Sequence, residues 1–328
     1  MQTKNIYLAY SEHLFIIVLS LLAGYNVFYD NSKDFGIYFA HYNSVSWDNY
    51  LGDEDVYFEY LYKLLVAFSV LVFRIDYYVF ASLIAFVSLQ IKFYLFSKRP
   101  YAPFLKVAYL LTLFPFNECL RTRSALALAF VFLALELRNR KFLSLILVLF
   151  GAFMHYSFMP FVLIWFFYNY LDDIKKARFF LGIGSVGGIV IAVLFKYIDV
   201  ILGYVAFIDP RIFAYFLEDE GYFNVWILPK YLLLGLTSYL VLKNKLDSLN
   251  TILIFIATSF VILSFSIIKI NMLSLGIFEL GFFAYFLVVT NQSLTNKSFI
   301  KFLFFVVILM DFAFKILQLP VFILWLFN

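Results

Sequence analysis

Long apolar runs, separated by short polar connections, recur along almost the whole chain. They predict helices embedded in a membrane, because a bilayer core of about 30 Å needs roughly 20 helical residues, whereas a β-barrel shows short alternating segments. The runs lie at 6–28, 57–73, 77–97, 101–116, 121–138, 142–171, 178–197, 225–242, 250–268, 272–290 and 299–318. The pattern predicts an all-α polytopic membrane protein with about 10–12 transmembrane helices, in a single membrane domain over residues 1–328.

The composition agrees with lipid as the solvent of this chain. Of its 328 residues, 64% are hydrophobic and 14% are charged, and the mean hydropathy is +0.92. No soluble fold buries that much apolar surface. A single cysteine, Cys119, excludes an intrachain disulfide, and the three histidines, His13, His41 and His155, lack the spacing of zinc ligands. We therefore expect no metal and no cofactor.

The basic residues of the short connections predict the topology, because cytoplasmic loops carry an excess of Lys and Arg. One arrangement places all five basic connections inside, at 98–99, 138–141, 175–178, 243–245 and 297–301. It requires that the run 57–73 is a re-entrant or half-spanning element, and that the run 142–171 goes out and returns. Outer-face loops then lie at about 29–56 and 198–224.

The run 142–171 is short for two crossings. Each arm has about 14–15 residues and is about 21–22 Å long, which is less than the hydrocarbon core. The tip, at residues 154–157, would lie below the outer surface, where non-helical backbone is tolerated only inside protein or beside a water-filled cavity. We therefore expect His155 to line a cavity that opens outward.

Two arginines and this histidine are the main candidates for chemistry. Arg121 and Arg123 begin a predicted helix at its outward end, where the helix dipole favours anions and guanidiniums bind phosphate. The alternative is that they reach to lipid headgroups. His155 is either a hydrogen-bonded core histidine or a general base for a sugar hydroxyl that attacks a carbon bearing a phosphate leaving group.

The outer loops hold further candidates. Asp34, Tyr38 and Tyr42 share a helical face, and aromatic rings beside carboxylates suit sugars. The alternative for the tyrosines is an aromatic belt at the membrane interface. Arg211, in the loop 198–224, is a further anion contact or only part of a solvated turn.

Several of these residues together resemble a known family. The segment R-T-R-S-A-L-A at 121–127, the basic turn at 138–141 and F-M-H-Y-S at 153–157 resemble the EpsG family of bacterial polysaccharide polymerases, which belongs with the Wzy O-antigen polymerases. Two outlying segments also match the family pattern, Asp34 to Tyr42 with Glu54 to Tyr57, and Lys269 with Asn271. Thr122 stands where the family usually has glutamine, and Lys269 replaces an arginine, which loses the bidentate fork.

The resemblance implies a GT-C-like, metal-independent glycosyltransferase of the bacterial cytoplasmic (inner) membrane, acting in lipopolysaccharide or exopolysaccharide biosynthesis. It would transfer glycan from one undecaprenyl-pyrophosphate-linked oligosaccharide to another at the outer face. Its expected partners are that lipid-linked oligosaccharide, membrane lipids and a chain-length regulator, with no nucleic acid. We predict catalytic roles for His155 and Arg121, and substrate binding by Asp34, Tyr38, Tyr42, Glu54, Arg123, Arg211, Lys269 and Asn271.

Two other functions remain open at this point. An O-antigen ligase-like glycosyltransferase would use the same arginine and histidine chemistry. A flippase or transporter of lipid-linked oligosaccharide would show internal repeats and charges at the membrane midplane. The sequence has no evident repeat and its charges collect on one predicted face, which favours an enzyme.

Overall fold

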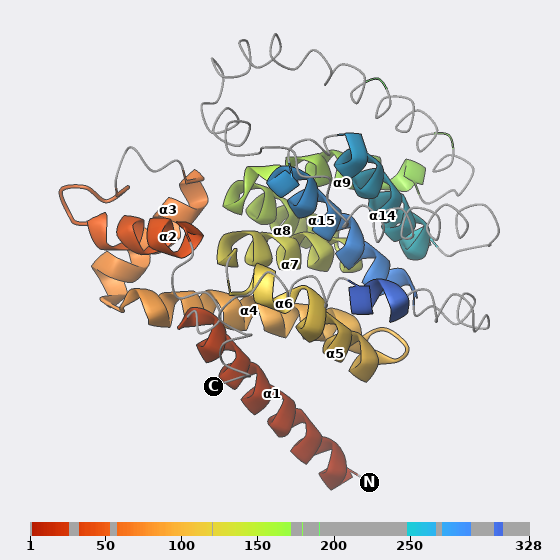
Figure 1. Ribbon diagram of the computed structural model, residues 1–328, viewed down its shortest axis with the longest axis horizontal. Helices are drawn as coiled ribbons and strands as arrows, with labels where there is room; N and C mark the ends of the chain where they lie inside the picture. The colour runs from red at the N-terminus through yellow and green to blue at the C-terminus, as the bar shows by residue number, and fades with distance from the viewer. Residues whose placement is uncertain are drawn as a thin grey trace. The chain divides into compact units, whose positions relative to one another are not determined.

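A computed structural model describes residues 2–25, 33–52, 58–119, 121–171, 248–266, 271–289 and 305–310, with the single residues 179 and 190. Every regular element within these ranges is a helix (Figure 1), which confirms the predicted all-α class. The described residues form two compact units, one within 1–166 and the other within 167–311. The single domain over 1–328, the number of spans and the GT-C-like arrangement stay predictions.

The first unit contains most of the described helices. They are α1 (Gln2–Gly24), α2 (Lys33–Ser44), α3 (Tyr60–Phe68) with the π-helical turn η1 (Ser69–Phe73), α4 (Tyr77–Ser97), α5 (Ala102–Thr112), α6 (Phe114–Asn117), α7 (Thr122–Glu136), α8 (Lys141–Met154), the 3-10 turn η2 (Tyr156–Phe158) and the start of α9 (Met159–Leu171). In the second unit, α14 (Ser248–Ser266) packs against α15 (Asn271–Val289).

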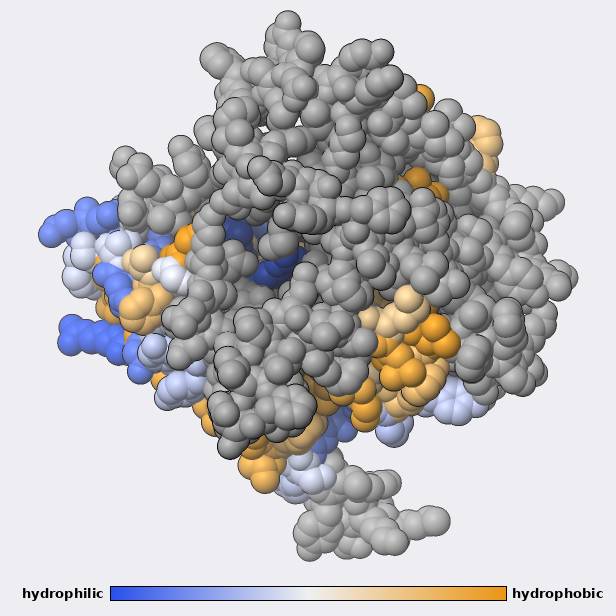
Figure 2. Space-filling model, in the orientation of Figure 1, coloured by the Kyte–Doolittle hydropathy of each residue, from blue (hydrophilic) through white to orange (hydrophobic). Residues whose placement is uncertain are grey.

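Helix α4 is the described helix whose length and apolar composition suffice to cross a membrane. It covers 77–97, as predicted, and begins where the Asp76 carboxylate accepts a hydrogen bond from the Val79 N–H at 2.9 Å. Large apolar side chains lie exposed on other helices of the unit, for example Leu14, Phe142 and Leu163, and Figure 2 shows hydrophobic residues on the described surface. Such exposure suits a lipid environment.

The predicted half-spanning element corresponds to a short helix. The apolar helix formed by α3 and η1 runs from Tyr60 to Phe73 and is about 21 Å long at 1.5 Å per residue. It ends at Arg74, whose φ of 52° lies in the left-handed region. Its length is less than a hydrocarbon core, as the predicted topology requires, and its place in the membrane stays a prediction.

Helices α4 and α7 lie side by side and run in the same direction (Figure 1). The Ser88 hydroxyl of α4 donates to the Ala125 carbonyl of α7 at 3.0 Å, and Arg99 pairs with Glu136 at 2.7 Å. Both contacts join residues 37 apart, so one parallel register holds along the helices. The Arg99–Glu136 pair also brings two of the basic connections, at 98–99 and 138–141, to one end of the helices.

Helix α8 returns antiparallel along α7, and α9 then folds back onto α8. The Ser144 hydroxyl donates to the Ala134 carbonyl at 2.6 Å and accepts from the Trp165 indole N–H at 2.7 Å. At the other end of α8, Gly151 lies directly on α7. The helical break between the two arms falls at His155, as predicted, and α8 has 14 residues, about 21 Å. The depth of this tip in a membrane stays a prediction.

Candidate functional site

One buried carboxylate joins two of the predicted site residues. Glu59, just before α3, forms an ion pair with the Arg123 guanidinium through its Oε2 atom. Its Oε1 atom lies 2.7 Å from His155 Nδ1 and accepts a weaker hydrogen bond from the Tyr156 backbone N–H at 3.3 Å. The Glu59 side chain is 3% exposed. We call Glu59, Arg123 and His155 the Glu59 cluster.

The packing of the helices explains why these distant residues meet. Helices α7 and α8 are antiparallel, and one register describes which of their positions face each other. This register sets Ala134 opposite Ser144, Ala127 opposite Gly151, and Arg123 opposite His155. The last pair therefore lies opposite each other at the start of α7 and the end of α8. Helix α3 packs against α8, which brings Glu59 to the same level. The sequence folds this way because small residues let the two helix backbones approach closely.

Aromatic rings surround the Arg123 guanidinium. Its Cζ atom lies 4.7 Å from the ring centroid of Phe58, 5.7 Å from that of Tyr38 and 5.8 Å from that of Tyr62. A guanidinium over an aromatic face gains cation–π attraction, and more so where water is excluded. With its side chain 13% exposed and paired to Glu59, Arg123 holds the carboxylate in place.

The hydrogen bond to Glu59 selects one form of His155. An ionised carboxylate only accepts hydrogen bonds, so His155 Nδ1 carries the hydrogen and Nε2 carries a lone pair. The Nε2 atom lies 3.4 Å from the Ser157 hydroxyl, and the His155 side chain is 22% exposed. A carboxylate and an imidazole that it orients can together act as a general base.

Glu59 and His155 lie in connections between helices, and their pKa values support this assignment. Burial alone raises the pKa of Glu59, but the hydrogen bond to His155 and the charge of Arg123 bring it below its ordinary value. Burial lowers the pKa of His155; the hydrogen bond to Glu59 opposes this, and the charges of Arg123 and Arg121 add to it. At neutral pH the site therefore holds an ionised Glu59 and a neutral His155.

Arg121 lies beside this cluster at the beginning of α7. It is the residue that precedes the first turn of the helix, and its side chain is half-buried. Its charge is close enough to lower the pKa of His155. The first N–H groups of α7 add a partial positive charge at the same place. The arrangement offers a base and a cationic region next to each other.

Comparison with known families decides what kind of protein this is. The sequence model of the EpsG family matches residues 13–326, which is nearly the whole chain. The chain belongs to the EpsG family. This family is associated with Wzy-type polymerases, so the chain is a membrane protein of the polysaccharide polymerase type. No curated protein and no solved structure matched the chain.

The structure describes only some of the side chains predicted for the site of this EpsG-family protein. Tyr38 lies against Arg123 and stacks on Phe58 with 5.0 Å between ring centroids. Tyr42 is 3% exposed, and its hydroxyl donates to the Ile75 carbonyl at 2.8 Å, outside the Glu59 cluster. Substrate binding by either tyrosine stays a prediction. The remaining predicted side chains lie outside the described residues: Asp34, Glu54, Arg211, Lys269 and Asn271.

Glu59 was missed by the sequence reasoning. The predicted outer-face loop ended at about residue 56, and residues 57–73 were interpreted only as an apolar run. A carboxylate at the start of such a run is itself a signal, because ionisable residues in membrane segments are usually functional. In this EpsG-family chain that signal gives the residue that joins Arg123 to His155.

The described part of this EpsG-family chain offers no ready metal site. Within it, no three His, Cys, Asp or Glu side chains come together in a way that could hold a metal ion. The guanidinium groups of Arg121 and Arg123 place positive charge near His155, and the start of α7 adds to it. The site is therefore suited to bind an anion.

Proposed function

We propose that this protein is a polysaccharide polymerase that transfers a glycan from one undecaprenyl-pyrophosphate-linked oligosaccharide to another at the outer face of the bacterial cytoplasmic membrane. The hydrogen bond from His155 to Glu59, at 2.7 Å and beside Arg121, carries the proposal. It supports a base for the acceptor hydroxyl next to a cation for the leaving group.

In the proposed reaction, His155 Nε2 takes the proton of the acceptor sugar hydroxyl. The hydroxyl oxygen forms a bond to the anomeric carbon of the donor glycan, and the bond from that carbon to the pyrophosphate oxygen breaks. The electron pair leaves with the lipid pyrophosphate. Glu59 holds the imidazole by Nδ1 and stabilises the imidazolium that forms.

The departing pyrophosphate is assigned to Arg121 and the first turn of α7. Glu59 and Arg123 pair with each other, and Arg121 is a further cation whose charge acts on His155. Guanidinium groups bind phosphate oxygens by two parallel hydrogen bonds, and helix N-termini favour anions. These groups act most strongly when negative charge develops on the leaving oxygen.

The basic connections support an outward-facing site. The pair Arg99–Glu136 brings 98–99 and 138–141 to one end of α4 and α7, and the Glu59 cluster lies at the opposite end of α7. If the basic end is cytoplasmic, as positive connections usually are, the cluster faces outward. A lipid-anchored substrate could then enter from the outer leaflet.

The test is complementation of a deletion in the native strain with His155→Ala. We expect loss of long polymer at an unchanged membrane level of protein, with a single repeat still transferred to its final acceptor. The matched control is His13→Ala, because His13 bonds to Gln90 at 2.9 Å on an exposed face. A normal ladder of chain lengths with His155→Ala would contradict the assignment. Loss of the single capped repeat as well would indicate a ligase or a flippase.

A further inference from the structure

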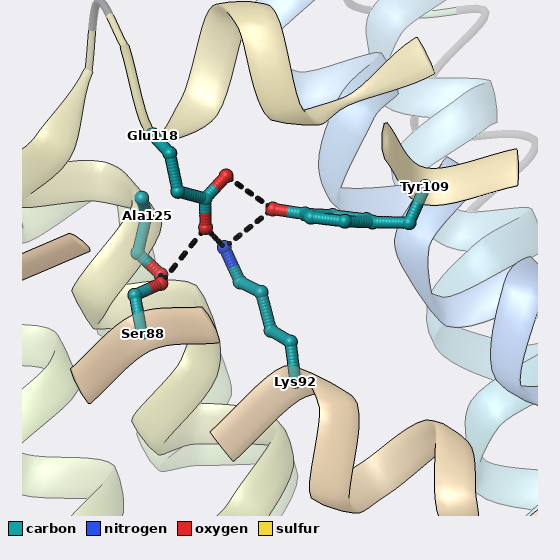
Figure 3. A network of polar contacts seen from close by, with 5 residues as sticks. All are labelled: Ser88, Lys92, Tyr109, Glu118 and Ala125. Carbon is teal, nitrogen blue, oxygen red and sulfur yellow. Dashed lines mark hydrogen bonds and ion pairs between the residues drawn. The ribbon is translucent and has the colours of Figure 1, made fainter. Parts of the chain in front are cut away.

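A second buried polar cluster lies where α4, α5 and the turn before α7 meet (Figure 3). Lys92 Nζ donates to Glu118 Oε1 at 2.6 Å and to the Tyr109 hydroxyl oxygen at 2.9 Å. The Tyr109 hydroxyl in turn donates to Glu118 Oε2. The Ser88 hydroxyl lies 3.0 Å from both Glu118 Oε1 and the Ala125 carbonyl oxygen, so one proton is shared by two acceptors. We call Ser88, Lys92, Tyr109 and Glu118 the α4–α7 network.

Stability alone does not explain this network. The Lys92 and Glu118 side chains are both 0% exposed, and the cost of removing two charges from water can exceed their attraction. Apolar side chains of similar volume often hold helices together as well as a buried ion pair does. A fully satisfied polar network also fixes the geometry of the groups that it joins. This is because hydrogen bonds form only at short distances and along preferred directions.

The network fixes the chain on both sides of the two arginines. Glu118 comes three residues before Arg121, and Ala125 comes two residues after Arg123. Both contact the hydroxyl of Ser88 on α4. The segment that carries Arg121 and Arg123 is therefore attached to one helix by its two ends.

We propose that the α4–α7 network positions Arg121 and Arg123 for the transfer reaction. It sets the start of α7 against α4, which determines where Arg121 meets the pyrophosphate and where Arg123 holds Glu59. The inference rests on the proposed function. A displacement of about 1 Å in a catalytic group can cost a factor of about 100 in rate, so a positioning network of this kind has a measurable effect.

The test replaces the network by apolar side chains in the triple variant Lys92→Met, Tyr109→Phe and Glu118→Leu. The protein is purified in detergent and reconstituted, with lipid-linked oligosaccharide from a polymerase-deficient strain as substrate. We expect thermal unfolding close to that of the wild type, kcat per folded molecule lower by at least about tenfold, and weaker inhibition by inorganic pyrophosphate. A merely structural role changes yield and unfolding temperature and leaves these two quantities unchanged.

The matched control is Lys106→Met with Glu12→Leu, which removes another Lys–Glu pair, at 2.7 Å between α5 and α1. It should leave kcat and pyrophosphate inhibition unchanged. If the triple variant does not fold, Ser88→Ala decides, because it removes only the shared hydroxyl. We expect Ser88→Ala to lower kcat and to weaken inhibition by pyrophosphate, each by less than the triple variant does.

The result that overturns the inference is wild-type kcat and pyrophosphate inhibition in the folded triple variant or in Ser88→Ala. Arg121→Ala separates this failure from failure of the proposed function. If Arg121→Ala is inactive while the network variants are fully active, only the positioning role is wrong. If Arg121→Ala itself makes normal polymer, the role of Arg121 in the reaction is wrong.

Discussion

Glu59 is the residue on which the other members of the proposed site depend. Its carboxylate neutralises Arg123 with one oxygen and orients His155 with the other. A single substitution of Glu59 should therefore disturb both contacts. Substitutions of single residues therefore test the proposed site most directly.

Glu59→Gln keeps the shape of the side chain and removes its charge. We expect polymer synthesis to fall by a factor of roughly 10²–10⁴, the usual contribution of an oriented general base. Because a buried Arg123 is then left without its counter-charge, the protein also becomes less stable, by about 3–5 kcal/mol. Gel analysis of the polysaccharide at matched protein levels measures the first effect. Glu59→Asp retains the charge and should keep more activity than Glu59→Gln; the opposite order would contradict the role of the charge.

The pH dependence of the rate follows from His155. A general base must be unprotonated, and burial with the charges of Arg123 and Arg121 brings the pKa of His155 below 6.5. The rate should therefore be constant at neutral pH and fall as the pH decreases, with its midpoint below 6.5. Initial rates of the reconstituted protein over this range measure it. A midpoint above 6.5 would mean that Glu59 stabilises the imidazolium more than the arginines oppose it.

At the scale of the elements, the contact between α7 and α8 sets the distance from Arg123 to His155. Gly151 lies where a Cβ atom would come within 2.7 Å of Val131 Cγ2 and 2.9 Å of the Ala127 carbonyl oxygen. Only glycine allows the two helices to approach this closely. The end of α8, and with it His155, is located by this contact.

Gly151→Ala should therefore separate the two helices and move His155 away from Glu59. Overpacking of this kind costs about 1–3 kcal/mol, which offsets the better helix propensity of alanine. We expect activity to fall more than the amount of protein, as measured by polymer synthesis per folded molecule. Gly36→Ala in α2 is the control, because a Cβ atom there meets nothing within 4 Å. Equal activity of both variants would show that this contact does not locate His155.

Several of the described helices were predictable from the sequence, while the cluster that joins them was not. Hydropathy is a local signal, so it gave α4 its bounds at 77–97, and the length of the run 142–171 placed a hairpin tip at residues 154–157. Glu59 lies 64 residues from Arg123 and 96 from His155, and their meeting depends on tertiary packing. Nothing in the sequence distinguished the two arginines at the start of α7, but in the structure Arg123 pairs with Glu59 and Arg121 is the residue that precedes the first turn.

At the scale of the whole molecule, the open question is which side of the membrane the site faces. A cysteine-labelling experiment is simple in this chain, because its single cysteine, Cys119, is buried and can be replaced. We expect Ser157→Cys to react with an impermeant thiol reagent in cells with an intact cytoplasmic membrane. Arg140→Cys should react only after that membrane is opened. Both positions are exposed, so the difference reports sidedness. Labelling of Arg140→Cys from outside would contradict the topology.

Arg123 and His155 share one carboxylate, and this links release of the lipid carrier to loss of a proton. Before transfer the charges of Glu59 and Arg123 sum to zero; once His155 has taken the proton, the cluster carries one net positive charge. The cluster therefore attracts the lipid pyrophosphate more strongly after transfer, when it is the leaving product, than before transfer. Release of the lipid carrier would then be coupled to loss of the proton to water. A solvent isotope effect on product release in the wild-type protein would reveal that coupling.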